Sequence, residues 1–208
     1  MSDNATIASG FAELGAGTWL TGRGQPAASL GDVVRRRRKG WFVRDRASLG
    51  MVESSGSTWF SDASRPFLTH IPCAAPVTAV SHKILVAPAA ARSGAELVRV
   101  VPMSLRGAIC VTVFEREWVV MATASRTMRI PVEDGGTLSV TPESAVAWTG
   151  NHPTGFVQRL GVWDVILPRA PRSLMLHFHG PCLVWVEGAN SQAARLANRQ
   201  NSGRAHGV

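Results

Sequence analysis

Cysteine is scarce in this sequence, and its few copies follow no recognisable pattern. Cys73, Cys110 and Cys182 are odd in number, far apart and never spaced as C-x-x-C. Proteins stabilised by several disulfides have a higher cysteine content and an even number of cysteines, and cysteine zinc sites need closely spaced pairs. The sequence therefore argues against both, and it fits a protein of the reducing cytoplasm.

Long apolar segments are missing as well. No run approaches the roughly 18 apolar residues that a membrane helix needs. The opening residues, MSDNATIASGFAELG, have no basic segment followed by an apolar one, so they do not read as a signal peptide. They also lack the arginine-rich amphipathic character of a transit peptide. We expect a soluble, cytoplasmic protein without a transmembrane segment.

Motifs of catalysis and nucleotide binding are also missing. The sequence contains no G-x-S-x-G elbow, no phosphate-binding P-loop and no G-x-G-x-x-G. Glu115 and Glu117 are spaced like paired acid–base carboxylates, but they flank Arg116 at the expected tip of a hairpin. The sequence thus gives no motif for an enzyme, requires no cofactor and identifies no small-molecule substrate.

Lysine is almost entirely replaced by arginine. Lys39 and Lys83 are the only lysines among 22 basic residues, in a chain with a net charge of +8. One cluster concentrates this charge, and its members are Arg35, Arg36, Arg37, Arg38, Lys39, Trp41, Arg44 and Arg46.

This basic cluster allows three interpretations. Basic side chains beside aromatic ones are typical of single-stranded nucleic-acid sites. A localisation signal or a contact with an anionic membrane surface has the same composition. Structurally, a solvated loop or an edge strand uses such charges to prevent pairing with other sheets.

Short β-like runs dominate the rest of the chain. They are rich in Val, Leu, Trp, Phe and Thr, they are separated by Gly and Pro turns, and they lie at 17–21, 84–86, 97–101, 109–114, 118–122, 128–132, 137–140, 145–149, 163–167, 173–178 and 182–186. Short strands at regular spacing with such turns predict an all-β sandwich or barrel. Recurring prolines disfavour long helices.

The composition divides the chain into three parts. Residues 1–65 are small and polar, which predicts a loosely held arm that carries the basic cluster and one short strand at 17–21. Residues 66–189 are expected to form the β-sandwich domain, and 190–208 a tail with a short helix at 192–198. A V-x-P-x-S echo between 100–105 and 140–145 indicates that the sandwich contains two similar units.

Two histidines form an H-x-H pair: one lies in the expected strand at 173–178 and the other directly follows this strand. Period-two alternation places His177 and His179 on one face, opposite Leu174, Leu176 and Phe178. Metal sites of cupin-like barrels begin in this way, but they need a carboxylate a few residues on and another histidine. The next carboxylate is eight residues away and the next histidine lies in the tail. These residues are weak metal-site candidates.

Two fragments resemble one known family. They are GGTLSVTPESAVAWTG at 135–150 and RSLMLHFHGPCLVWVEG at 172–188. Both resemble the altered-inheritance-of-mitochondria protein twenty-four family, with the likeness extending over about 80–188. The closing turn departs from that pattern, because Gly180-Pro181-Cys182 stands where Gly-x-Gly is expected.

The resemblance implies a fold and little chemistry. It implies a sandwich of duplicated units similar to the tryptophan RNA-binding attenuation protein (TRAP), in a family that is widespread in bacteria. Bacterial members have no established catalytic residues, so the resemblance transfers no site. We therefore expect a non-enzymatic structural or interaction protein that acts as a homo-oligomer or through a protein partner. The alternatives are a nucleic-acid-binding protein that uses Arg35–Lys39 and a metal-dependent barrel enzyme at His177 and His179.

Overall fold

The protein, here a computed structural model, is built of β-strands. The structure describes residues 5–8, 10–22, 25–36, 49–99, 108–157 and 174–188. In these ranges the only helical elements are two 3-10 turns, η1 (Ser81–Lys83) and η2 (Ala89–Ala91). The all-β sandwich prediction is confirmed.

Six strands recur three times along the chain. Repeat 1 contains β2 (Phe11–Leu14), β3 (Gly17–Thr21), β4 (Gln25–Ser29), β5 (Val33–Arg36), β6 (Gly50–Ser54) and β7 (Thr58–Ser61). Repeat 2 contains β8 (Phe67–Pro72), β9 (Val77–Val80), β10 (Ile84–Pro88), β11 (Arg92–Arg99), β12 (Ala108–Phe114) and β13 (Trp118–Thr123). Repeat 3 contains β14 (Thr127–Val132), β15 (Thr137–Val140), β16 (Ala145–Thr149), β17 (Thr154–Val157), β18 (Leu174–His179) and β19 (Cys182–Glu187). A short β1 (Thr6–Ala8) pairs with β2.

The repeats share one strand order. In each, the first, sixth and third strands form one half sheet, which is β2-β7-β4, β8-β13-β10 or β14-β19-β16. The second, fifth and fourth strands form the other, which is β3-β6-β5, β9-β12-β11 or β15-β18-β17. Gly17, Val77 and Thr137 begin the second strands and lie 60 positions apart.

A β-bulge at the same place supports this equivalence. The third strand shifts register against the sixth at Pro26/Ala28, at Ile84/Val86 and at Ala145/Ala147. Bulges are specific features of strand geometry, so a bulge in all three copies indicates a true structural repeat.

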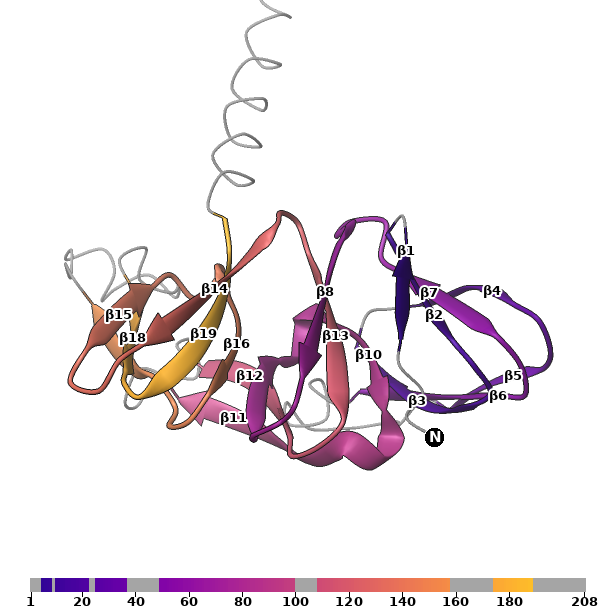
Figure 1. The fold of residues 1–208 in the computed structure, drawn as a ribbon, viewed down its shortest axis with the longest axis horizontal. Coiled ribbons are helices and arrows are strands. Elements are labelled where there is room, and N and C mark those ends of the chain that lie inside the picture. The colour runs from indigo at the N-terminus through magenta and orange to yellow at the C-terminus, as the bar shows by residue number, and fades with distance from the viewer. Residues whose placement is uncertain are drawn as a thin grey trace, which may run out of the picture.

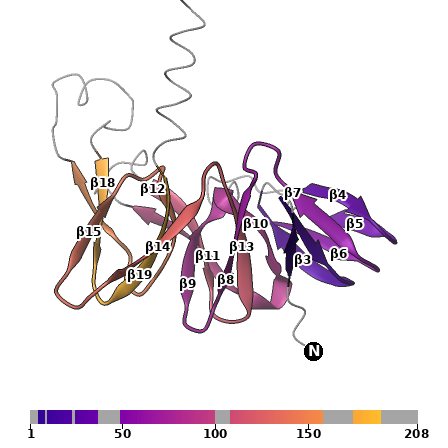
Figure 2. The same ribbon diagram turned by 45° about the horizontal axis from the view of Figure 1, so that its top comes forward.

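Neighbouring repeats are joined by continuous sheets. The second strand of one repeat pairs antiparallel with the third strand of the next, β3 with β10 and β9 with β16. This pairing creates two six-stranded sheets, β5-β6-β3-β10-β13-β8 and β11-β12-β9-β16-β19-β14. Figures 1 and 2 show them between the two end sheets, with the indigo first repeat at one end and the orange and yellow third repeat at the other.

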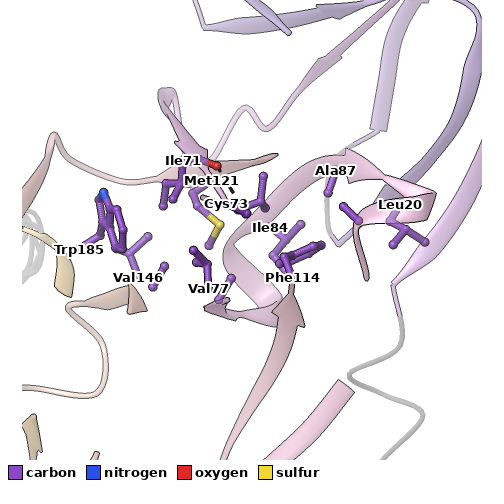
Figure 3. Close-up of a cluster of buried hydrophobic side chains, with 14 of the residues drawn as sticks. Leu20, Ile71, Cys73, Val77, Ile84, Ala87, Phe114, Met121, Val146 and Trp185 are labelled. Atoms are coloured by element: carbon purple, nitrogen blue, oxygen red, sulfur yellow. Dashed lines mark hydrogen bonds between the residues drawn. The ribbon is translucent and has the colours of Figure 1, made fainter. Parts of the chain in front are cut away.

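Three apolar cores separate the four sheets. The first holds Trp19, Phe60 and Trp118, the central one Ile71, Phe114 and Trp185, and the third Trp148, Phe178 and Val184. Figure 3 shows the central core, to which both six-stranded sheets contribute. Strands β10, β13 and β16 are buried on both faces apart from Thr149, which is why their sequences are nearly continuous apolar runs.

The N-terminal third differs from the predicted arm. The described residues of 5–36 and 49–61 contain β1–β7, and Leu14, Val52 and Phe60 are buried in the first core. The run at 17–21 predicted β3, whereas the small, polar sequences of the other strands hid them. The division at residue 65 falls between repeats, yet β3, β5 and β6 share a sheet with strands of repeat 2.

The number of units also differs from the sequence-based expectation. Three repeats are present where the echo indicated two, and they are related by about 60 positions rather than 40. The echo segment at 140–145 joins the second and third strands of repeat 3, whereas its partner at 100–105 lies outside the described residues. The expected strand at 163–167 and the tail at 190–208 also lie outside them.

Candidate functional site

The basic cluster begins on a sheet edge. Arg35 and Arg36 belong to β5, the outermost strand of a six-stranded sheet, and lie opposite Val52 and Met51 of β6. The Arg35 side chain is exposed. Positive charge on an edge strand discourages pairing with other sheets, as one of the three interpretations requires. Arg37, Arg38, Lys39, Trp41, Arg44 and Arg46 lie outside the described residues.

The two histidines lie on one face of β18, as alternation predicted. His177 is half-buried and His179 exposed, whereas Leu176 and Phe178 point into the third core. His179 has hydroxyl neighbours on both sides: Thr137 Oγ1 lies 3.3 Å from Nδ1 and Thr154 Oγ1 lies 3.3 Å from Nε2. Ser139 Oγ is 3.5 Å from His177 Nε2.

This face offers hydroxyl groups rather than additional strong metal ligands. Among the residues that the structure describes, no group of three or more His, Cys, Asp or Glu side chains is placed to hold a metal ion. The imidazoles lie beside Thr and Ser hydroxyl groups of the neighbouring strands.

The three cysteines are free thiols. Burial raises the pKa of all three, and the pKa of Cys73 rises to about 11 through burial and, secondly, the nearby Glu117 carboxylate. The nucleophile is the thiolate, and a raised pKa suppresses it. The cysteines thus behave as small apolar side chains.

Sequence reasoning missed one buried ionic site. Lys83 lies in η1 of repeat 2, and its Nζ donates to Glu187 Oε1 over 2.6 Å and to the carbonyl of Glu143. The other oxygen, Glu187 Oε2, accepts the Ala124 backbone N–H at 3.0 Å. The available signal was Lys83 itself, one of two lysines in an arginine-rich chain.

This ionic site joins repeats 2 and 3. Glu143 and Glu187 belong to repeat 3, and Ala124 directly follows the last strand of repeat 2. Burial lowers the pKa of Lys83, whereas its hydrogen bond to Glu187 and the Glu187 charge oppose that shift. Glu143, Glu187 and Ala124 all lie at the junction between the repeats, so the geometry supports a role in holding the repeats together.

The ends of the stack present a different kind of site. β4 at one end and β15 at the other are edge strands in the described part of the chain. Their equivalents inside the stack are all paired: β10 and β16 correspond to β4, and β3 and β9 correspond to β15. Each end sheet therefore has only half of the repeated strands that an inner sheet has, and the two halves are complementary.

No helix in the described ranges is long and apolar enough to span a membrane.

Comparison with known proteins identifies a similar fold. No family model matches the chain, and neither does any curated protein. The chain is similar to the X-ray crystal structure of a Streptococcus pyogenes protein, a structural genomics target, with a TM-score of 0.68 and 12% identity over 95% of this chain and 98% of that one. At this identity the likeness shows the fold alone.

Proposed function

We propose that the protein is a non-enzymatic structural protein that acts through self-assembly. The observation that carries this proposal is the pair of complementary half sheets at the two ends of the stack. Sheet edges with unused N–H and C=O groups are natural association sites, and repeat architectures extend by stacking the same interface again.

The chemistry of the described residues is consistent with a structural role. The Lys83–Glu187 pair binds one repeat to the next, the histidines pair with hydroxyl groups, and the thiols have raised pKa values. None of these arrangements brings a nucleophile, a base and an acid together. We also propose a cytoplasmic location, which the free cysteines support.

Family membership is also part of the proposal. The fragments at 135–150 and 172–188 belong to repeat 3, and the resembled family has a fold of duplicated β units. This supports a TRAP-like relationship, since both folds repeat one small β unit. An alignment of homologous sequences in which those fragments fail to match the family would remove it.

Sedimentation velocity over a wide concentration range tests the proposed function. We expect the sedimentation coefficient to rise with concentration or to stay at a value larger than that of one chain. A monomer at every concentration would overturn self-assembly. Repeating the measurement at high salt distinguishes β pairing, which survives, from exposed charge attraction, which is screened.

A further inference from the structure

From the strand order we infer that β15 of one molecule pairs antiparallel with β4 of a second copy and joins the two end sheets into one continuous sheet. This inference rests on the proposed self-assembly and names its contact. The new sheet would have the order β17-β18-β15-β4-β7-β2-β1, and its first six strands match the two inner sheets strand for strand. The protein contains two examples of this junction, β3 with β10 and β9 with β16.

The inner junctions define the register of the new pair. In the second junction Ala79 lies opposite Ala147, and Ala147 is the first paired residue after the bulge. The corresponding residue of β4 is Ala28. On β15, Val140 corresponds to Ala79. Val140 lies two residues after Leu138, which is paired with Phe178 of the core, and Ala79 lies two residues after the residue that is paired with Phe114 in the same way.

Three cross-strand pairs follow from that register. Val140 would lie opposite Ala28, Ser139 opposite Ser29, and Leu138 opposite Leu30 of the second copy. Leu30 is 69% exposed, the highest value among the exposed large apolar side chains of the described residues. A leucine pair between the copies would remove this side chain from water, which is favourable for association.

Features that protect edges do not block this pairing. Pro26 lacks an N–H, but its equivalents Ile84 and Ala145 lie outside the paired segments of the inner junctions. The bulge in β4 also occurs in β10 and β16, both of which pair on that side. Neither β4 nor β15 carries a charged residue, in contrast with the edge strand β5 and its arginines.

The contact joins unlike ends, so it can be repeated from copy to copy. Such heterologous contacts produce closed rings when the rotation closes and open filaments when it does not. Both assemblies place every copy of β4 beside a copy of β15, apart from the two ends of a filament.

Disulfide trapping tests the contact directly. Ser29→Cys protein and Ser139→Cys protein are oxidised mildly, separately and as a mixture, with the wild type as control for Cys110 and Cys182. We expect a new disulfide-linked dimer only in the mixture, and peptide mass spectrometry should identify a bond between positions 29 and 139. An assembled protein without that bond would overturn the β4–β15 contact and leave self-assembly in place.

Substitution of the exposed leucine gives a second readout. Leu30→Lys should raise the dissociation constant of the assembly at least about tenfold, since it places a charge in an apolar cross-strand pair. Val34→Lys is the matched control, because Val34 is 52% exposed on β5, outside the inferred contact. Equal weakening by both variants, with circular dichroism spectra unchanged, would contradict the inference. A wild-type monomer at all concentrations would overturn the proposed function as well.

Discussion

Lys83 Nζ lies 2.6 Å from Glu187 Oε1, although 104 positions separate the two residues in the sequence. The side chain of Lys83 is 3% exposed and that of Glu187 is 14% exposed. The pair thus fixes repeat 2 to repeat 3 in a setting where neither charge is well hydrated.

Removing one partner of this pair should destabilise the protein. Glu187→Gln leaves the more buried charge, Lys83, without its counterion, so we expect a loss of about 3 kcal/mol in the free energy of unfolding. Lys83→Met should cost less, because Glu187 is closer to solvent. Urea titrations of both variants measure the difference.

The double variant provides the control. Lys83→Met/Glu187→Gln should lose less stability than the sum of the single variants, because it leaves no uncompensated charge. Glu133→Gln changes an exposed turn carboxylate and should have little effect. Additive losses would show that the two groups do not interact.

The thiol of Cys73 should make stability fall at alkaline pH. Its pKa rises from 9.0 to about 11 on folding, so the folded protein holds the proton more tightly than the unfolded chain. Stability from this group is complete below pH 9.0 and is lost as pH rises toward about 11, by roughly 2 kcal/mol in total. Unfolding curves across this range measure the slope.

Cys73→Ala separates this effect from others. Lys83 acts in the opposite direction, because its lowered pKa makes its contribution rise with pH. The substitution changes the baseline through lost packing, but it should flatten the alkaline decline relative to the wild type. Parallel curves for the two proteins would contradict the assignment to Cys73.

The turn between β12 and β13 contains a strained residue. Glu117 has φ of 65°, in the left-handed region that disfavours residues with a side chain. Glu117→Gly should relieve the strain and raise stability by about 0.5 kcal/mol after the entropy of glycine is subtracted. Thermal unfolding measures this gain. Glu117→Ala keeps the strain and removes the carboxylate, so a gain from alanine would indicate charge instead.

Binding of polyanions should depend on the basic segment. Replacing Arg35–Lys39 with alanines should weaken binding to single-stranded RNA and flatten its dependence on salt, since each neutralised phosphate releases counterions. Fluorescence anisotropy at several salt concentrations measures both. Arg126→Ala/Arg129→Ala removes two exposed charges elsewhere and should have a smaller effect. A flat, salt-insensitive isotherm for the wild type would remove the nucleic-acid alternative.

Strand positions were predictable where large apolar side chains recur between clear turns or alternate with polar ones. The expected runs at 17–21, 137–140 and 145–149 coincide with β3, β15 and β16. Leu176, His177 and Phe178 alternate between core and surface as period two requires. These segments hold large apolar residues between clear turns, so local sequence determines their conformation.

Other strands could not be predicted, because long-range pairing creates them. β4 (Gln25–Ser29) contains a proline and small residues, and only its partner β7 makes it a strand. The three repeats share strand order and bulges rather than residues, so the sequence concealed them. The edge strands of each sheet are also determined by long-range pairing. For example, β3 pairs with β10, although more than sixty residues separate them in the sequence.

The shared inner sheets mean that the two boundaries between repeats are not points at which this chain can be divided. A cut between β7 and β8, at the boundary between repeats, would leave β3 without β10 and expose the central core on both fragments. Truncations at this boundary should therefore yield aggregating fragments.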